Sequence, residues 1–416
     1  MLQKLKEKTV RLLRWSEQYT KTDMVYLAKG SFWTWLGKGT ALLTGIAVAI
    51  AFANLLPKET YGNYKYILSV AGILGTFTLS GMIRAITRSV AQGYEGSLKK
   101  GVKVVSKWSS FILIAALIVS GYYFWQGNAL LGGGMLIVAL LQPIVQSTEV
   151  YKAQLLGKKL FKIQGIYLTL QEVTQAGLII AALFFTSNAL VLIAILFITN
   201  ALFGVIYLWQ TTKKYIENKK VDAGTIPYAK HLSVIRILET GAKHLDKVLI
   251  FQMLGAAPTA IYSFALLPTD KLDSFFRSIG NIVLPKFSDT PFKKLQKTVT
   301  RKVLIAFAAS IVISVSLILA LPTIFNLVFP AYMDSVIYAQ WLAVSLIFIP
   351  EFLFTYILIA HKKTKAMYGI NVSSDVLRIV LLAILLSIYG IWGAIYTLLI
   401  YLSYRTMVKM IYFYSR

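Results

Sequence analysis

The sequence predicts an all-α, polytopic membrane protein with twelve transmembrane helices, and three observations support this fold class. The 416 residues are 57% hydrophobic and only 14% charged. Apolar runs of about 18 to 25 residues recur along nearly the whole chain, and each is long enough to cross ~30 Å of hydrocarbon as a helix. Lys and Arg gather in alternate loops between these runs. Helices are expected because a backbone in lipid must satisfy its own hydrogen bonds.

The expected spans form two sets of six. The first set is residues 32–54, 65–83, 108–126, 129–149, 163–186 and 188–209. The second set is residues 232–254, 258–283, 302–328, 336–360, 366–388 and 390–412. The polar and basic segment 210–231, with Gly224 and Pro227, links a predicted bundle at 32–209 to one at 232–416. With six spans each, both halves begin on the same side of the membrane and are parallel repeats.

A weak internal similarity supports this repeat. Residues 55–68 align with residues 253–266 at an offset of 198 residues. The pairs at that offset are Leu56 with Leu254, Tyr64 with Tyr262, Leu68 with Leu266 and Lys38 with Arg236. We therefore expect Lys38 to be the first-half counterpart of a charged position in the second half.

The segment 1–31 precedes the first span and is basic. Charges interrupt any apolar core in it, so we do not expect a cleavable signal peptide. Its apolar residues Leu5, Leu12, Leu13 and Trp15 fall at roughly helical spacing, which favours an interfacial helix on the membrane surface. A disordered basic tail is the alternative.

The formal net charge of +26 has a topological explanation. The basic clusters are the N-terminus, residues 84–107, 152–162, 213–230, 286–302 and 362–365, and the C-terminus with Arg405, Lys409 and Arg416. The loops on the other side have only Lys58 and Lys65. This positive-inside pattern predicts that both termini are cytoplasmic. The basicity is therefore topological, aided by anionic lipid headgroups, and we expect membrane lipids rather than nucleic acid as partners.

Catalytic and metal-binding patterns are missing from the sequence. There is no cysteine, and His231, His244 and His361 are too scattered to form a metal site. No nucleotide-binding module is recognisable, so we expect no cofactor. The loops opposite the basic ones are short, whereas membrane polymerases and ligases present catalytic residues in a large external loop. We therefore expect a non-enzyme whose site lies among the helices or in the cytoplasmic loops.

Two of the expected helices carry a stripe of charge. The first stripe is Arg236, Glu239, Lys243, Asp246 and Lys247, and the second is Asp270, Asp273, Ser274, Arg277 and Asn281. On a helix at about 100° per residue, the residues of each stripe fall within an arc of roughly 100°. Each charge at mid-bilayer costs about 2.5 to 3.5 kcal/mol on insertion scales, so these faces must avoid lipid. Buried ion pairs that lock two helices together would explain them, as would a hydrated cavity, and the number of charges favours the cavity. Further polar residues within spans are Lys38, Glu172, Glu351, Asp375 and Arg378.

Four segments carry a likeness to a known family: LDKVLIFQMLGAAPTAIYSFA at 245–265, LLPKETYGNY at 55–64, VLPKFS at 283–288 and LVFPAY at 327–332. Through these segments the chain resembles the bacterial polysaccharide flippases, the lipid-linked-oligosaccharide exporters of the multidrug/oligosaccharidyl-lipid/polysaccharide superfamily. The likeness covers essentially residues 30–410, including the layout of six plus six spans.

The resemblance implies two six-helix bundles around a central cavity that opens alternately to either side. The implied cargo is an undecaprenyl-diphosphate-linked saccharide, for O-antigen or capsule, carried from the inner to the outer leaflet of the bacterial cytoplasmic membrane. Implied partners are membrane lipids and the glycosyltransferases and polymerase of the same pathway. A flippase for the peptidoglycan precursor or another lipid carrier is one alternative. A drug/cation antiporter of the same superfamily is another, although it would need an acidic or apolar cavity.

The charged residues receive roles under this hypothesis. Attraction of the diphosphate or of acidic sugars is assigned to Lys38, Arg236, Lys243 and Lys247, with Arg277 as a further candidate. Ion coupling, or positioning of these cations, is assigned to Glu239, Asp246, Asp270 and Asp273. A diphosphate needs cationic partners in a low-dielectric cavity, which is the physical basis of the assignment.

Overall fold

The computed structural model describes residues 24–415 except 289 and 362. Within these residues it is helical, without a strand. The helix or tail expected for the N-terminal segment lies outside the described residues up to residue 23.

The first half contains α2 (Met24–Leu55), α3 (Lys58–Thr76), α4 (Met82–Ala91), α5 (Ser97–Trp125), α6 (Ala129–Thr148), α7 (Tyr151–Gly157), α8 (Phe161–Leu183) and α9 (Ala189–Lys214). The second half contains α10 (Thr225–Leu254), α11 (Ala256–Ser288), α12 (Phe292–Val328), η1 (Pro330–Ser335), α13 (Val336–Val344), η2 (Ser345–Phe348), α14 (Glu351–Ala360), α15 (Thr364–Tyr389) and α16 (Ile391–Ser415). The prediction of twelve spans is confirmed, with α3 and α4 forming the second span and α13, η2 and α14 the tenth.

The tenth span is broken in its middle, which the apolar pattern alone did not predict. The chain tightens into the 3₁₀ helix η2 after Val344 and resumes as α14 at Glu351. Pro350 occupies the N-cap position of α14. Proline has no backbone N–H to donate to a preceding turn, so a continuous α-helix is interrupted there. The break brings Ser345 and Glu351 to the same cavity.

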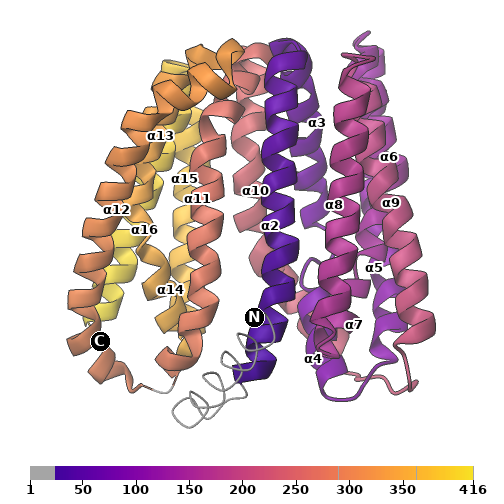
Figure 1. The fold of residues 1–416 in the computed structure, drawn as a ribbon, viewed down its shortest axis with the longest axis vertical. Coiled ribbons are helices and arrows are strands. Elements are labelled where there is room, and N and C mark those ends of the chain that lie inside the picture. Colours follow the sequence, from indigo (N-terminus) through magenta and orange to yellow (C-terminus); the bar gives the residue numbers. More distant parts are fainter. Residues whose placement is uncertain (1–23, 289, 362, 416) are drawn as a thin grey trace, which may run out of the picture.

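The helices form two groups in space (Figure 1). In the first group α5 packs on α6, α2 on α8 and α6 on α9; in the second α15 packs on α16, α12 on α13 and α11 on α14. The groups meet where α3 packs on α10 and α11, and where α4 packs on α10. The described chain begins and ends at the lower end in Figure 1, which also holds the linker from α9 to α10. We call it the basic end, and the other the opposite end.

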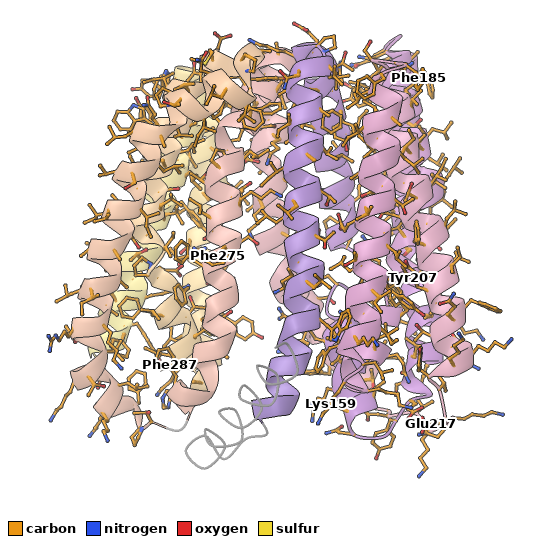
Figure 2. The ribbon with its side chains drawn as sticks, viewed as in Figure 1. Lys159, Phe185, Tyr207, Glu217, Phe275 and Phe287 are labelled. Atoms are coloured by element: carbon orange, nitrogen blue, oxygen red, sulfur yellow. The ribbon has the colours of Figure 1, made fainter. Side chains whose placement is uncertain are left out.

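The outer surface is apolar, as a lipid-facing surface must be. On α12 the side chains of Leu304, Val312, Leu319 and Leu327 are each at least 64% exposed. Their spacing of seven and eight residues keeps them on one face of the helix. Side chains cover the outer surface of both bundles in Figure 2. A contiguous apolar face of this size marks a membrane-contacting surface.

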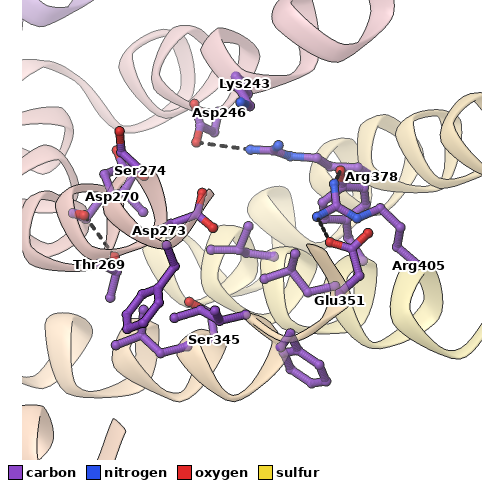
Figure 3. Close-up of a pocket in the computed structure, with 18 of the residues that line it drawn as sticks. Lys243, Asp246, Thr269, Asp270, Asp273, Ser274, Ser345, Glu351, Arg378 and Arg405 are labelled. Carbon is purple, nitrogen blue, oxygen red and sulfur yellow. Dashed lines mark hydrogen bonds and ion pairs between the residues drawn. The ribbon is translucent and has the colours of Figure 1, made fainter. Parts of the chain in front are cut away.

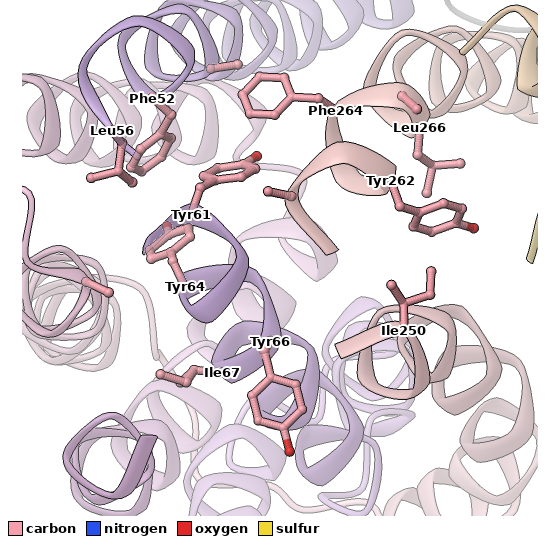
Figure 4. Close-up of a cluster of buried hydrophobic side chains, with 14 of the residues drawn as sticks. Phe52, Leu56, Tyr61, Tyr64, Tyr66, Ile67, Ile250, Tyr262, Phe264 and Leu266 are labelled. Atoms are coloured by element: carbon pink, nitrogen blue, oxygen red, sulfur yellow. The ribbon is translucent and has the colours of Figure 1, made fainter. Parts of the chain in front are cut away.

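The two bundles touch closely at the opposite end. A Cβ placed on Gly62 of α3 would lie 1.9 Å from the carbonyl oxygen of Ala256, so the two backbones approach as only glycine permits. Beside this contact, the ring centroids of Tyr61 and Phe264 are 4.7 Å apart, and those of Phe264 and Tyr332 are 3.8 Å apart. Figure 4 shows Tyr61 and Phe264 within the surrounding hydrophobic cluster. We call Tyr61, Phe264 and Tyr332 the aromatic seal, because they close the junction between the bundles.

Two polar contacts reinforce the aromatic seal. Lys58 pairs with Asp334 at 2.7 Å, and the amide of Asn54 donates to the carbonyl of Val328 at 3.1 Å. Each joins the first bundle to the second. The ion pair is exposed at Asp334, so the apolar ring contacts supply most of the stabilisation.

The start of α3 and the start of α11 lie 198 residues apart, at Lys58 and Ala256. This is the offset at which the sequence shows its weak internal similarity. The aligned tyrosines, Tyr64 and Tyr262, are both buried in the hydrophobic cluster drawn in Figure 4. The similarity therefore corresponds to two helices that begin at equivalent places and meet at the junction of the halves.

At the basic end the linker is fixed to the first bundle by side chains. Glu95 accepts a hydrogen bond from the backbone N–H of Glu217, and Lys158 pairs with both carboxylates, at 3.0 Å from Glu95 and 2.6 Å from Glu217. Asp222 accepts hydrogen bonds from Ser89 and from the N–H of Gly224. The linker is thus held against α4 and α5.

A substitution at Gly62 tests the close approach of the bundles. In Gly62→Ala the Cβ must retreat by roughly 1.5 Å to reach an ordinary contact of about 3.5 Å, so we expect the opposite end to open. Spin labels at Ser187 and Tyr389, one on each bundle, report the distance there, because the chain has no cysteine of its own. The matched control is Gly121→Ala, since nothing lies within 4 Å of a Cβ at Gly121. An unchanged distance distribution in Gly62→Ala would contradict the tight closure.

The linker attachment is expected to be pH-dependent. Burial raises the pKa of Glu95, but hydrogen bonds from Glu217 and Lys158 outweigh burial and hold that pKa below its ordinary value. A lowered folded-state pKa stabilises the attachment above the unfolded value, and the stabilisation is lost as pH falls through the folded value. The protection factors of the linker amides, which are relative to the intrinsic exchange rate at each pH, should therefore fall in acid, below about pH 4.5. In Glu95→Gln the amides should exchange faster at neutral pH and lose this dependence. An identical pH profile in both proteins would refute the role of Glu95.

Candidate functional site

A polar cavity of about 450 Å³ lies within the second bundle (Figure 3). Its walls come from α10, α11, η2, α14, α15 and α16, and the first bundle contributes no described residue to its lining. The charged residues of the lining are Lys243, Asp246, Lys247, Asp270, Asp273, Glu351, Arg378 and Arg405. Basic and acidic residues are therefore equal in number. We call this space the polar cavity.

The helical stripes predicted from the sequence bring several site candidates together. Lys243, Asp246 and Lys247 of α10 face the cavity, as do Asp270 and Asp273 of α11. Lys243 and Asp270 are exposed, whereas Asp246 is only 2% exposed. The same cavity thus has a solvent-accessible charged rim and a buried charged floor.

Four other predicted site residues stand apart from this set. Lys38 is exposed on α2 and does not line the polar cavity. It lies two turns from Gly45 on one face of α2, and a Cβ on Gly45 would lie 3.0 Å from the ammonium of Lys271. Lys38 therefore faces the junction between the bundles. The side chains of Arg236, Glu239 and Arg277 lie outside the described part of the structure.

Asp246 organises the side of the cavity nearest α10. Its carboxylate accepts a hydrogen bond from the hydroxyl of Tyr262 at 3.0 Å and lies 3.5 Å from the guanidinium of Arg378. The ammonium of Lys247 is farther away, at 3.9 Å. Asp246 is therefore held mainly by Tyr262 and Arg378. This arrangement leaves Lys247 weakly paired at the cavity wall.

Glu351 organises the side nearest α16. It accepts a hydrogen bond from Arg405 at 3.0 Å and a further contact from Lys409, whose ammonium also donates to Thr355 at 2.8 Å. Glu351 and Lys409 are 4% and 3% exposed. An ionised side chain in such surroundings is tolerated only when paired and hydrogen-bonded. One carboxylate thus compensates two cations, the buried Lys409 and the partly buried Arg405.

Tyr401 joins the two ionic clusters. The guanidinium of Arg378 lies 5.3 Å from its ring centroid and that of Arg405 lies 4.9 Å away. Arg405 also donates to the Tyr401 hydroxyl, which contacts Asp375 at 3.4 Å. The ring and hydroxyl of one tyrosine thus separate two guanidinium groups that would otherwise repel each other.

Sequence reasoning missed the α16 part of this site. From the sequence, Arg405 and Lys409 are topological charges of the C-terminus, but in the structure both pair with Glu351, with Lys409 buried and Arg405 partly buried. A signal was present, because Tyr401, Arg405 and Lys409 are spaced four residues apart and share one face of a helix. The same reasoning that found the stripes on α10 and α11 would have found this one.

Charged residues also face each other across the junction between the bundles. Lys65 of α3 lies over the ring of Tyr61 at 5.1 Å and interacts electrostatically with Asp270 of α11. Glu172 of α8 interacts with Lys271 of α11. The sequence placed Lys65 in a loop, whereas the structure places it within α3. The first bundle thus presents charges of its own to the rim of the polar cavity.

The sequence leaves two interpretations of the charged stripes open, buried ion pairs and a hydrated cavity. The structure shows ion pairs at the floor of the site and exposed charges at its rim. The floor is made of ion pairs that bind α10, α14, α15 and α16 together. The rim is exposed and charged, as a hydrated cavity requires. Among the described residues no group of His, Cys, Asp and Glu could hold a metal ion.

Removal of the Glu351 charge tests the buried floor. Glu351→Gln leaves Arg405 and Lys409 without their counter-ion, so we expect a loss of about 3 to 5 kcal/mol in the free energy of unfolding. Lys409→Met should cost less, because the pair of Glu351 and Arg405 remains. Thermal unfolding in detergent measures both. Glu59→Gln at an exposed position is the control and should change stability by less than about 0.5 kcal/mol. Equal stability of Glu351→Gln and the control would show that the floor is not held by charge.

Comparisons with known proteins agree with this architecture. The sequence profile of the family described as Polysaccharide biosynthesis protein matches residues 27–291. A Shigella flexneri protein named "Putative O-antigen transporter" is 21% identical over 305 residues, which cover 68% of this chain and 71% of that protein.

Solved structures of similar fold are transporters. An inward-facing multidrug resistance MATE family transporter of the MOP superfamily aligns with a TM-score of 0.58 at 12% identity, over 90% of this chain and 95% of that chain. A MOP superfamily transporter from Pyrococcus furiosus aligns with a TM-score of 0.61 at 12% identity, over 93% and 95%. At this identity the likeness shows the fold, which supports the twelve-helix arrangement. Since the family profile covers more than half of the chain, the protein belongs to the polysaccharide biosynthesis protein family.

Proposed function

We propose that the protein is a flippase that moves an undecaprenyl-diphosphate-linked saccharide from the inner to the outer leaflet of the bacterial cytoplasmic membrane by alternating access. The observation that carries the proposal is the polar cavity, a charged and solvent-accessible space inside a membrane-spanning helical bundle. Such a space is costly in lipid and is maintained where a polar cargo must cross.

The rim of the cavity suits a diphosphate. Lys243 and Lys247 lie one helical turn apart on α10 and both line the cavity. Ammonium groups bind phosphate oxygens through charge-assisted hydrogen bonds, which are strong where water is partly excluded. We assign Arg236, Lys38 and Arg277 to the same attraction along the path to the cavity. The hydroxyl of Ser274 is an additional hydrogen-bonding group for sugar.

The acidic residues divide into two roles under this proposal. Asp246 holds Arg378 and Tyr262 in place, so it positions the cationic wall. Asp270 and Asp273 stand at the rim and are the candidates for ion coupling, together with Glu239. The same carboxylates oppose non-specific entry of other anions. A cargo must therefore replace existing ionic contacts, because the positive charges of the cavity are balanced by carboxylates.

The closed opposite end supports entry of the cargo from the basic end. The aromatic seal joins the bundles there, and the positive-inside pattern puts the basic end in the cytoplasm. The saccharide headgroup would enter from the cytoplasmic side, while the polyprenyl tail stays in the bilayer along the junction of α2 and α11. Glycosyltransferases and a polymerase would act before and after this step.

A reconstitution assay tests the proposal. The protein in liposomes should move an undecaprenyl-diphosphate-linked saccharide between leaflets faster than empty liposomes do. The same assay with the peptidoglycan precursor and with a cationic dye, with and without an ion gradient, distinguishes the other lipid carrier and the drug antiporter. Failure to move any saccharide lipid, by protein with its normal unfolding temperature, would overturn the flippase assignment.

The cations of α10 should be essential for this movement. In Lys243→Gln with Lys247→Gln we expect at least a tenfold slower rate, because a charge-assisted hydrogen bond contributes about 1.5 to 3 kcal/mol. Lys293→Gln with Lys297→Gln removes equal charge from exposed positions on α12 and is the matched control. Equal rates in the two double variants would remove the α10 cations from the mechanism.

A further inference from the structure

A second concave site lies outside the polar cavity, between the two bundles at the basic end. This groove of about 820 Å³ is built by α5 of the first bundle and by the first turns of α10. Its lining is Lys103, Val104, Lys107, Trp108, Phe111, Ile226 and Lys230. None of these residues has a role in the proposed transport step, so a ligand bound in the groove is independent of the proposed function.

The α5 residues of the groove form one continuous stripe. Lys103 and Lys107 are four residues apart, and Trp108 and Phe111 follow on the same side of the helix. Charge therefore precedes aromatic surface in the direction from the basic end toward the opposite end. The groove is cationic at one end and apolar at the other.

The depth of the stripe can be estimated from helix geometry. Trp125, the last residue of α5, is 85% exposed at the opposite end. Lys107 precedes it by 18 residues, or about 27 Å of helix, which is close to the ~30 Å thickness of the hydrocarbon. Lys107 and Trp108 consequently lie at the boundary between headgroups and acyl chains. Lys103 reaches one turn farther into the headgroup layer.

The groove is accessible and its charge is not compensated. Trp108 and Phe111 are 44% and 49% exposed, and all three lysines are exposed. In the part of the chain that the structure describes, no carboxylate forms an ion pair with Lys103, Lys107 or Lys230. The ammonium of Lys230 instead lies 5.8 Å from the ring centroid of Trp108, so the lysine from α10 reaches across the groove to α5.

We propose that this groove binds an anionic phospholipid of the cytoplasmic leaflet. The lipid phosphate lies among the ammonium groups of Lys103, Lys107 and Lys230, and one acyl chain lies against Trp108, Phe111 and Ile226. Basic pockets between transmembrane helices on the cytoplasmic side suit acidic headgroups. A small soluble anion would contact only the lysines and leave Trp108 and Phe111 unoccupied. These two aromatic side chains lie at the depth of the acyl chains, which a phospholipid supplies.

The bound lipid contacts both halves of the protein. Five of the lining residues belong to α5, and Ile226 and Lys230 belong to α10. A lipid held by both helices stabilises the arrangement in which they are adjacent. Occupancy of the groove therefore favours the conformation with these two helices together.

The test compares lipids on the full-length protein in nanodiscs. Phosphatidylglycerol should raise the unfolding temperature relative to phosphatidylcholine, and native mass spectrometry should retain bound phosphatidylglycerol. The triple variant Lys103→Ala, Lys107→Ala and Lys230→Ala should bind it on the order of 100-fold more weakly, since each lysine near an anionic surface contributes roughly a fivefold factor. Lys293→Ala, Lys294→Ala and Lys297→Ala remove the same charge from α12 and should leave binding unchanged.

A photoreactive phosphatidylglycerol gives a readout on the unaltered protein, so the test does not depend on folding of the triple variant. The expected adducts fall on residues 103–111 and 226–230. Adducts spread over other basic loops, or equal losses in both triple variants, would overturn a specific site. Preferential capture of undecaprenyl diphosphate over phosphatidylglycerol at these residues would overturn the phospholipid assignment and make the groove an entry site for the cargo.

Discussion

The need to compensate charge inside a membrane is the constraint on which the rest of this structure depends. Glu351 is surrounded by Arg405 and Lys409, and Asp246 by Arg378 and Lys247, so each buried carboxylate serves more than one cation. The pairs link four helices, because their members come from α10, α14, α15 and α16. The ionic floor therefore fixes the packing of the second bundle as well as the chemistry of the cavity. Replacement of one carboxylate disturbs several helices at once.

The two halves solve the problem of interior polarity differently. The described interior of the first bundle is joined by neutral groups: Gln142 donates to the carbonyl of Ala71 at 2.7 Å, and Gln171 donates to Asn200 at 2.5 Å. Neutral amides cost less to bury than ions and need no water. The second bundle uses ions and therefore keeps a solvent-accessible rim. The halves share a helical plan, but their described interiors differ in charge.

Much of this arrangement could be predicted from sequence, for identifiable reasons. Apolar length defined the spans, because the thickness of the hydrocarbon sets the number of helical residues needed. The stripe of Lys243, Asp246 and Lys247 was visible because a helix repeats its face every three to four residues. The second stripe on α16 has the same spacing, but its position near the chain terminus led to a topological interpretation. Position along the chain did not reveal whether Arg405 lies in a loop or in the bundle.

Other features depend on contacts that a linear pattern does not contain. The offset that pairs Lys38 with Arg236 located equivalent helices, yet Lys38 faces the junction between the bundles rather than the polar cavity. The need for glycine at Gly62 arises only from the carbonyl of Ala256, which is 194 residues away along the chain. The break before α14 is suggested by Pro350, but only the structure shows that it delivers Glu351 to α16.

The aromatic seal and the polar cavity differ in whether their side chains need water. The aromatic seal is made of rings that need no water, so the opposite end can close tightly when the bundles meet. The polar cavity is lined by exposed ions such as Lys243 and Asp270, which lose stability if water is removed without a replacement partner. Removal of water from these ions therefore requires that other charged or hydrogen-bonding groups take its place. The aromatic junction can thus close without water, whereas the charged rim cannot.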